Sequence, residues 1–388
     1  SKCNELEKVE IPIDSKLEII EEDAFSCSHI ETINIPPHLK IIRKNTFSNC
    51  MNLLRIEILK NCELQTIEDG AFNNSSIQEI NIPQSLIELK EGWCRNTPNL
   101  VNIKVNENNP KYAVYQDYFI IGKSSLENEY HDVLVFCSRN IKAEITPNEE
   151  ELLQLLGIFD ESSLGKYLTL PSFIEIIEPY SFEKCRIYEV EILTDSKLRI
   201  IDKYAFFSSL INIISIPSHV IKICKGAFSH CTELKYVEIQ ENSELQIIEK
   251  ESFSNSSITS ISIPPHVTQI CESAFSNCEM LRKVDIPENS ELKMIEINAF
   301  QYCSFESIFI PSHLLILRKN TFKEPLYYSG NLKHVKISEN SELQKIEKNA
   351  FDQCQIEDIN LPSKLIFLDK NWMKSTPNFT KIRISENN

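Results

Sequence analysis

Residues 258–278 read ITSISIPPHVTQICESAFSNC, and this stretch decides the fold because its order of residue types recurs along most of the chain. Three isoleucines spaced as I-x-x-I-x-I are followed by proline, then by a second apolar group, and then by Ala274-Phe275. In an extended segment this spacing brings alternate apolar residues onto one face. One such segment cannot bury that face alone, so the recurrence predicts stacked copies.

The aromatic residue of the stretch marks the repeat most clearly. Short coils of the form I-P-x-x-L alternate with longer coils of the form E-N-S-E-L, so two coils together take about 47 residues. This period predicts a solenoid whose Ile, Leu and Phe ladders form one continuous core. Eleven of the 20 phenylalanines occupy the same slot after Ala, Ser or Thr: Phe25, Phe47, Phe72, Phe182, Phe206, Phe228, Phe253, Phe275, Phe300, Phe322 and Phe351.

The composition excludes several classes of protein. Glycine occurs 7 times, whereas average usage predicts roughly 27 in 388 residues. Phosphate cradles and dinucleotide folds need glycine where the backbone approaches the ligand. The net charge of −16 disfavours binding to nucleic acid and to anionic membrane surfaces. The sequence holds no phosphate loop, nucleophile elbow or metalloprotease motif. We therefore expect a protein without enzyme activity and without a cofactor.

The ordered pattern L-x-x-I-x-I-P-x-x-L-x-x-I-x-x-x-A-F-x-x-C resembles the BspA-like (Treponema pallidum type) leucine-rich repeat family. The resemblance covers residues 3–102 and 169–388. It implies a leucine-rich-repeat-like curved rod of short β-strands and turns, in a class that includes many cell-surface adhesins. The family often carries glycine a few residues before Ala-Phe, where this chain has charged residues such as Glu21-Glu22-Asp23. We expect Asp, Asn, Glu and Ser to make most turns instead.

The predicted domains are repeat coils over residues 1–102, a non-repeat island over 103–168, and repeat coils ending in a truncated module over 169–388. The stretch 38–108 resembles 313–388, so we expect a chain cut from a longer array. The alternative is a natural terminus with a frayed last coil.

The island, residues 103–168, interrupts the period with elements of its own. Two apolar runs, at 118–121 and 133–136, predict a β-hairpin. Pro147-Asn148 precedes an amphipathic run, which predicts a short helix over 149–156. No apolar run in the whole sequence approaches the roughly 18 residues of a membrane span.

Histidines and cysteines follow the repeat as well. His219, His266 and His313 recur on every second coil, roughly 10 Å apart, which is too far for one metal ion. We interpret them, with His38, as turn residues and expect no metal site. Six cysteines stand three residues after a repeat phenylalanine, where we expect buried free thiols. An occasional disulfide, for example between Cys278 and Cys303, is the alternative. The six are Cys50, Cys185, Cys231, Cys278, Cys303 and Cys354.

A solenoid presents one extended face of strand side chains, and a partner is expected there. Two features mark the candidate surface: aromatic residues at outward positions, and basic residues gathered toward the C-terminal end. The alternative is that strand propensity alone selected the aromatics. The candidate set, with two tyrosines of an inserted segment, is Tyr236, Phe309, Lys283, His334, Lys336, Lys381, Arg383, Tyr327 and Tyr328.

These features favour a protein-binding module, the ectodomain of a cell-surface or secreted adhesin that engages a host or matrix protein. An intracellular, cytoplasmic interaction scaffold on the same solenoid is the second interpretation. A third is glycan binding by the island residues Tyr112, Tyr115 and Tyr118. We expect neither a nucleic-acid partner nor direct insertion into a membrane. A repeat scaffold tolerates many surface residues, so it does not identify the ligand.

Overall fold

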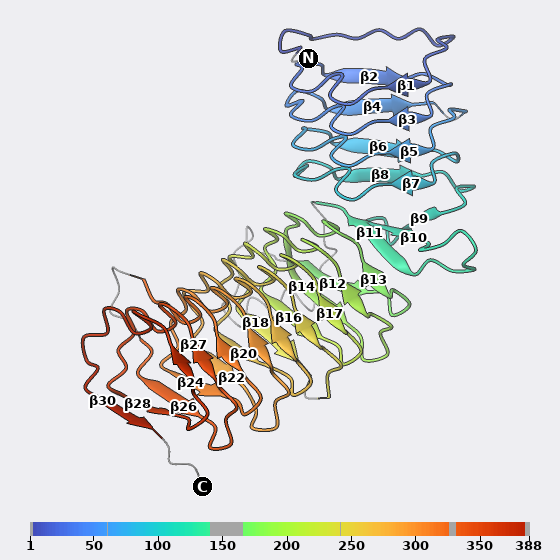
Figure 1. Ribbon diagram of the computed structural model, residues 1–388. Helices are drawn as coiled ribbons and strands as arrows, with labels where there is room; N and C mark the ends of the chain where they lie inside the picture. The colour runs from blue at the N-terminus through green and yellow to red at the C-terminus, as the bar shows by residue number, and fades with distance from the viewer. Residues whose placement is uncertain (1–2, 60, 140–165, 241, 326–330, 385–388) are drawn as a thin grey trace, which may run out of the picture. The chain divides into compact units, whose positions relative to one another are not determined.

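The computed structural model describes residues 3–59, 61–139, 166–240, 242–325 and 331–384. All regular elements within these ranges are β-strands, and the strands of one coil stack on those of the next (Figure 1). The predicted repeat solenoid is confirmed. Residues 149–156, the predicted helix, lie outside the described ranges. The chain divides into two compact units: unit 1 comprises Ser1–Tyr167 and Phe173–Ile187, and unit 2 comprises Leu168–Ser172 and Tyr188–Asn388.

Unit 1 begins with four coils, each of which adds one short and one longer strand to two parallel sheets. The short strands are β1 (Ile19–Ile20), β3 (Ile41–Ile42), β5 (Thr66–Ile67) and β7 (Glu88–Leu89). The longer strands are β2 (Thr32–Ile35), β4 (Arg55–Ile58), β6 (Glu79–Ile82) and β8 (Asn102–Val105). Both sheets are continuous through their four strands.

The first part of the island folds into unit 1 as an antiparallel element. Strand β10 (Phe119–Gly122) pairs with β11 (Val133–Cys137), which confirms the predicted hairpin. A further strand, β9 (Tyr112–Tyr115), pairs with the other edge of β10 and was not predicted. Strand β11 then pairs in parallel with β13 (Ile176–Ile177), so the hairpin joins the repeat ladder. The domain boundaries at residues 102 and 168 stay predictions.

Unit 2 repeats the two-strand coil with greater regularity. One sheet begins at β12 (Lys166–Leu170), at the boundary of the unit, and continues through β14 (Ile187–Ile192), β16 (Ile213–Ile216), β18 (Tyr236–Ile239), β20 (Ser260–Ser262) and β22 (Lys283–Asp285). Two parallel pairs follow: β24 (Ser307–Ile310) with β26 (His334–Ile337), and β28 (Asp358–Leu361) with β30 (Lys381–Ile384).

The short strands of unit 2 form a second parallel ladder. It contains β15 (Ile200–Ile201), β17 (Lys222–Ile223), β19 (Ile247–Ile248), β21 (Gln269–Ile270), β23 (Met294–Ile295), β25 (Ile316–Leu317), β27 (Lys345–Ile346) and β29 (Phe367–Leu368). The second residue of these strands is buried from β15 to β27, so register places one apolar residue of every coil in the core.

The repeat phenylalanines fill the core of each unit as stacked rings. Between Phe206 and Phe300, successive ring centroids lie 5.0–5.2 Å apart and the planes agree within 14°. In unit 1, Phe47 stacks at 5.5 Å on both Phe25 and Phe72. Burying each such ring contributes about 1.5–3 kcal/mol, so the ladder carries much of the stability that holds neighbouring coils together.

Most coils close through a turn in which two residues, four apart, adopt the left-handed conformation. Asn45 and Asn49 have φ of 55° and 60°, and Ser273 and Asn277 repeat the pair in unit 2. Asparagine tolerates this region because its side chain bonds locally. Gly70, Gly92 and Gly226 are the described glycines with positive φ, so the expectation that other residues make most turns is confirmed.

Candidate binding site

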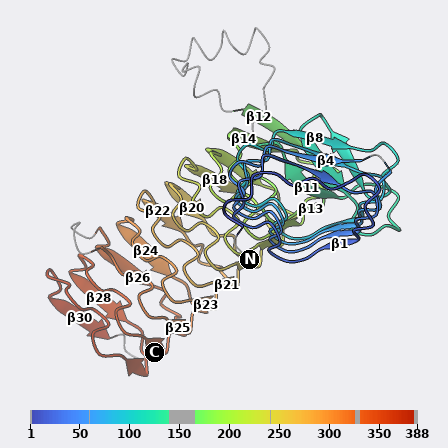
Figure 2. The same cartoon turned by 90° about the horizontal axis from the view of Figure 1, so that it is seen from above.

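The longer strands β14, β16, β18, β20, β22, β24, β26, β28 and β30 follow one another along unit 2 (Figure 1; Figure 2 shows the model turned by 90°), and we call the face made by their outward side chains the strand face. Burial alternates along these strands, as in β18, where Val237 and Ile239 are buried and Tyr236 and Glu238 are exposed. This period of two is the sign of a sheet with one packed and one open side. The strand face therefore offers a row of side chains on a rigid support.

Both predicted aromatics lie on the strand face, on strands that β20 and β22 separate. Tyr236 is 55% exposed, and its register neighbours are Ile213 on β16 and Ser260 on β20. Phe309 on β24 is half-buried, and the ammonium nitrogen of Lys336 lies 5.5 Å from its ring centroid. The two aromatics are thus separate contact points.

The predicted basic residues lie on the same face, and three of them are paired with carboxylates. Lys283 Nζ is 2.6 Å from Asp285 Oδ2, and Arg383 Nη1 is 2.6 Å from Asp358 Oδ2. Lys336 Nζ is 3.7 Å from Glu288 Oε1. Exposed pairs of this kind contribute about 0–1 kcal/mol to stability. A ligand carboxylate can therefore replace the protein carboxylate beside each cation with little loss of stability. His334 and Lys381 are also exposed.

Charge changes sign along the strand face. The outward carboxylates of Glu189, Glu191 and Glu238 belong to β14 and β18. Burial, and then the neighbouring carboxylate of Glu191, raise the pKa of Glu189. The outward basic residues Lys336, Lys381 and Arg383 belong to β26 and β30, with Asp358 on β28 as the acidic exception. The acidic and basic parts are separated by β20, β22 and β24.

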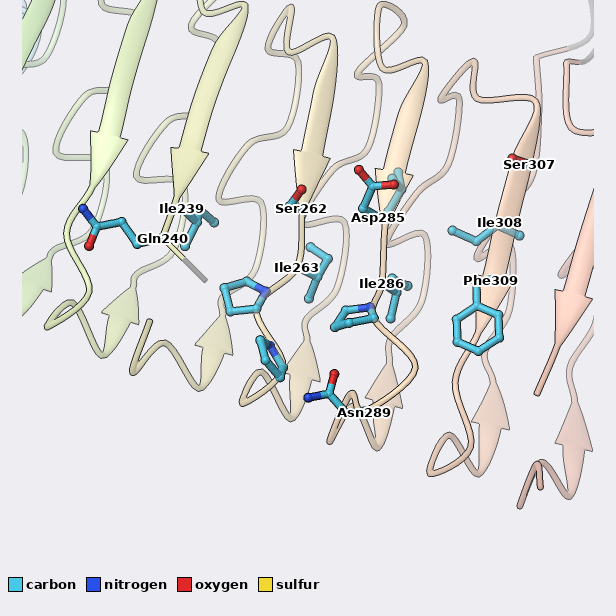
Figure 3. Close-up of a pocket in the computed structure, with 14 residues that line it drawn as sticks. Ile239, Gln240, Ser262, Ile263, Asp285, Ile286, Asn289, Ser307, Ile308 and Phe309 are labelled. Atoms are coloured by element: carbon cyan, nitrogen blue, oxygen red, sulfur yellow. The ribbon is translucent and has the colours of Figure 1, made fainter. Parts of the chain in front are cut away.

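A groove of about 850 Å³ crosses the strand face between these two parts, at the carboxyl ends of β18, β20, β22 and β24 (Figure 3). Ile263, Ile286 and Ile308 form its floor and are almost fully buried, exposed by only 2%, 7% and 3%. Gln240 and Phe309 stand at its opposite ends (Figure 3). Of the seven predicted residues that the structure describes, Phe309 is the one that lines this groove.

Proline opens the groove by ending the hydrogen-bond ladder. The backbone N–H of Ile263 still donates to the carbonyl of Asp285, 2.8 Å away. Pro264 and Pro265 follow in one coil and Pro287 in the next, and proline has no N–H with which to continue. One coil further, the sheet that runs through β22 ends, and β24 pairs with β26 instead. The gap in the ladder is local, because the N–H of Glu291 donates to the carbonyl of Pro265, 2.8 Å away, just beyond it.

The rim of the groove carries unengaged polar groups. The side chains of Gln240, Ser262, Asn289 and Ser307 line it, and none has a hydrogen-bond partner in the described part of the chain. Amides and hydroxyls of this kind can donate to and accept from a peptide backbone. The groove combines an apolar floor with a hydrogen-bonding rim, which is the usual composition of a recognition site.

Sequence reasoning missed most of the groove. It selected outward residues of the strands, whereas the groove also uses residues just beyond the strand ends. The signal was present as Ile-Pro-Pro at 263–265 and Ile-Pro at 286–287. Consecutive coils with proline directly after the strand predict a locally open ladder.

Two other groups of aromatic and charged residues in the described part of the chain do not form a comparable site, and a third candidate pair cannot be compared with them. Tyr327 and Tyr328 lie outside the described residues. The island residue Tyr112 is buried in the core, and its hydroxyl accepts a hydrogen bond from the N–H of Leu89, so it is not exposed to a glycan. Tyr115 and Tyr118 are partly exposed, and glycan binding by them stays a prediction. A hollow of about 530 Å³ in unit 1 is lined by three basic and three acidic side chains, whose charges balance.

The cysteines are thiols, and the six repeat cysteines are buried as expected. Cys231 Sγ lies 2.9 Å from the carbonyl of Phe206, and Cys278 Sγ lies 3.0 Å from that of Phe253. Burial raises the pKa of both thiols to about 12. Such thiols are poor nucleophiles, and the alternative of a disulfide between Cys278 and Cys303 is wrong because both are free.

The repeated histidines lie beside glutamates of the neighbouring coil. His38 Nδ1 is 3.1 Å from Glu63, His219 Nδ1 is 3.5 Å from Glu244, and His266 Nδ1 is 3.2 Å from Glu291. Their spacing and partners fit residues copied with the repeat. No group of three or more potential metal ligands occurs within the described residues. The same residues include no helix long and apolar enough to cross a membrane.

Solved structures with the same fold come from bacteria. A leucine-rich repeat protein from Eubacterium ventriosum is 18% identical, with 81% of this chain and 84% of that chain covered and a TM-score of 0.61. One from Bacteroides ovatus is 22% identical, with coverages of 97% and 83% and a TM-score of 0.57. A leucine rich cell surface protein from Faecalibacterium prausnitzii is 17% identical, with coverages of 87% and 74% and a TM-score of 0.52.

Similarity in sequence extends over nearly the whole chain at the level of the family. No curated protein matches the chain significantly. The family model described as BspA type Leucine rich repeat region (6 copies) matches residues 1–119, 156–265, 199–325 and 323–388. These matches omit only residues 120–155, which belong to the island. The chain therefore belongs to the BspA-type leucine-rich repeat proteins.

Proposed function

We propose that the protein is a binding module that holds a protein partner on the strand face of unit 2 and has no catalytic role. The groove across that face carries the proposal. It joins an apolar floor to the half-buried ring of Phe309 and to four unengaged polar side chains. Interfaces are anchored by such desolvated apolar pockets with aromatic neighbours, while the polar rim supplies orientation.

We place this module at the cell surface or outside the cell, as an adhesin for a host or matrix protein. Membership of the BspA-type repeat family supports a role in protein interaction. The similarity to a bacterial leucine rich cell surface protein agrees with the location, although it is a likeness of fold. An acidic protein with an exposed recognition groove suits an extracellular partner.

An intracellular scaffold is the second candidate, and the cysteines favour it. All thirteen are free thiols. Abundant free thiols are typical of a reducing compartment, whereas secreted proteins often form disulfides. Cell fractionation followed by a thiol assay separates the two locations. Native protein in the surface fraction with thirteen reduced cysteines supports secretion of a disulfide-free module. Absence of the protein from the surface fraction supports the scaffold.

A binding screen tests the proposed function. The full chain would be immobilised and exposed to a panel of purified extracellular-matrix, serum and cell-surface proteins. We expect at least one partner whose affinity falls about tenfold or more when Tyr236→Ala and Phe309→Ala are combined, since loss of an interface anchor commonly exceeds 1 kcal/mol. The matched control combines Asn34→Ala and Asn81→Ala on the outward side of β2 and β6 in unit 1. A partner that binds both variants equally well would contradict the choice of face.

A further inference from the structure

The geometry of the groove points to a specific kind of occupant: we propose that it binds an extended peptide segment of the partner, laid across the coils, with an apolar side chain in the middle, a basic residue at one end and an acidic residue at the other. This inference rests on the proposed function and narrows it to one site and one ligand class. The three parts of the proposal follow from the floor, the rim and the flanks of the groove.

The direction of the peptide follows from the lining. The groove is built from equivalent positions of four successive coils, so its long direction crosses the strands (Figure 3). Neighbouring strands of a sheet lie about 4.8 Å apart, and an extended chain advances about 3.3 Å per residue. The distance from β18 to β26 is thus on the order of 19 Å, which about six extended residues cover. A short linear segment fits this space better than a folded domain.

The centre of the groove selects an apolar side chain. Ile263, Ile286 and Ile308 line the centre of the groove beside the rings of Pro264 and Pro287. The carboxylate of Asp285 lines it too, but is paired with Lys283. An aliphatic or aromatic anchor on the peptide would remove the apolar part of this lining from water. A sugar is less suited, because its hydroxyls would meet an apolar floor. The ring of Phe309 is also already approached by Lys336 at 5.5 Å, which limits stacking with a sugar.

The rim supplies partners for the peptide backbone. Ser262 and Ser307 are exposed hydroxyls, and Gln240 and Asn289 are amides with both donors and acceptors. Their side chains have no partner in the described part of the chain. Main-chain hydrogen bonds give affinity without sequence preference, while the apolar centre gives preference for one side chain.

The flanks set the charge order of the peptide. Glu238 lies on β18 at one end of the groove, with Glu191 and Glu189 on β14 beyond it. Lys336 lies on β26 at the other end, and its pair with Glu288 is long and exposed on both sides. A peptide with a basic residue toward Glu238 and an acidic residue toward Lys336 complements both ends. Peptides of a single charge sign would be repelled at one of them.

The first test uses a phage-displayed library of random twelve-residue peptides, selected on the immobilised full chain. We expect enriched clones that combine an apolar residue with a basic and an acidic residue on opposite sides of it. Ser262→Trp fills the groove with an indole and should weaken a synthesised hit by more than about tenfold. The matched control is Asn34→Trp, an exposed position on the outward side of β2 in unit 1, which should change the affinity less than about twofold.

The second test exchanges a charge across the site. Replacing the basic residue of the hit peptide with glutamate should weaken its binding to the natural chain about three- to tenfold, and Glu238→Lys should restore it. Hits that bind Ser262→Trp as well as Asn34→Trp, or hits without the mixed charge order, would overturn the proposal. So would a glycan array whose hits are lost on Ser262→Trp, because the occupant would then be a sugar.

The experiments distinguish failure of the groove proposal from failure of the proposed function. If the protein panel yields a partner sensitive to Tyr236→Ala with Phe309→Ala but insensitive to Ser262→Trp, the strand face binds and the groove proposal is wrong. If neither the panel nor the library yields a ligand, both proposals fail. Thermal unfolding at the same temperature for both tryptophan variants establishes that they are folded.

Discussion

The two units depart from the same repeat in different ways: unit 1 takes a hairpin and a buried cation into its core, and unit 2 opens its strand ladder at the surface. In unit 1 the parallel stack of rings ends at Phe72, which meets Trp93 edge-on at 85°. Trp93 then packs at 49° on Phe136 of the hairpin strand β11. In unit 2 the rings from Phe206 to Phe300 stay stacked within 14°. The stack of unit 2 ends as that of unit 1 does, with Phe351 edge-on to Trp372 at 82°. What unit 2 adds is an irregularity on the surface, where the strand ladder opens into the groove.

The core of unit 1 needs a buried cation where the repeat is interrupted. Arg139 follows β11 and is 2% exposed. Its guanidinium donates to the carbonyls of Tyr180 and Ser181, each 3.1 Å away, and lies 4.0 Å from the buried carboxylate of Glu183. It also lies 4.4 Å from the ring centroid of Phe136. This cluster ties the end of the hairpin to the coil that follows it.

The difference separates structural irregularity from functional irregularity. Where the repeat is interrupted inside the core, polar groups need hydrogen-bond or ion-pair partners, because unpaired buried polar groups destabilise the fold. A break in the outer ladder leaves polar groups in water, where they are satisfied until a ligand replaces the water. The open ladder in unit 2 therefore costs little stability, because its unpaired groups are exposed to water. A binding site must be exposed in the same way.

The largest expected effect on stability comes from removing the buried cation of Arg139 in unit 1. Arg139→Met leaves the carboxylate of Glu183 buried without its cation, and should destabilise unit 1 by about 3–5 kcal/mol. Urea unfolding, followed by hydrogen exchange to assign the loss to unit 1, measures this. Arg186→Met, at an exposed position, is the control and should change little. Equal stability of the two variants would contradict the structural role given to Arg139.

The regular parts of both units could be predicted from sequence because the same apolar core positions recur in every coil. The slot shared by Phe228, Phe253 and Phe275 is buried in each coil, as the pattern required. Arg139 could not be predicted, because its partners lie more than 40 residues away and meet it only through the hairpin. The groove was missed for a related reason: it depends on where hydrogen bonds stop, and outward residues alone do not reveal this.

A smaller loss is expected from a turn in unit 2. Gly226 has φ of 62°, and a Cβ there would lie 2.3 Å from Tyr204 Cε1. Gly226→Ala should therefore cost about 2–3 kcal/mol, from the left-handed backbone and the displaced ring. Gly92→Ala in unit 1 has the same kind of φ, 68°, but its nearest contact is 3.4 Å, so about 1–2 kcal/mol is expected. Thermal unfolding compares them; the opposite ranking would contradict the steric explanation.

Each unit contains a buried glutamate, and the two differ in their partners. Glu183 has Arg139 beside it, whereas Glu324 in unit 2 is bonded by the N–H of Leu332 at 2.7 Å. Burial raises the pKa of Glu324 to about 7. Because the folded pKa exceeds the ordinary value of 4.5, this group stabilises the fold fully below pH 4.5 and progressively less as the pH rises through 7.

Substitution of this carboxylate should therefore remove part of the pH dependence. At pH 8 Glu324→Gln should be about 1–2 kcal/mol more stable than the natural chain, and at pH 4.5 the two should be similar. Glu339→Gln, at an exposed position, is the control. Urea unfolding at the two pH values measures the difference; a parallel pH profile for both variants and the natural chain would refute the assignment to Glu324.

The smallest effect on stability is expected at the binding surface. Phe309 is half-buried at the edge of the groove, so Phe309→Ala should cost less than about 1 kcal/mol. Its effect on partner binding should be larger than its effect on unfolding, and calorimetry on the same sample gives both. A loss of stability comparable to that of a core phenylalanine would make Phe309 a structural residue.

Hydrogen exchange with and without the selected peptide tests the central claim most directly. We expect slower exchange in segments 260–263, 283–289 and 307–310 of unit 2, and unchanged exchange in β2, β4, β6 and β8 of unit 1. Protection spread over the strands of unit 1, or bound peptide without protection around the groove, would contradict the claim that the open ladder of unit 2 is the binding site.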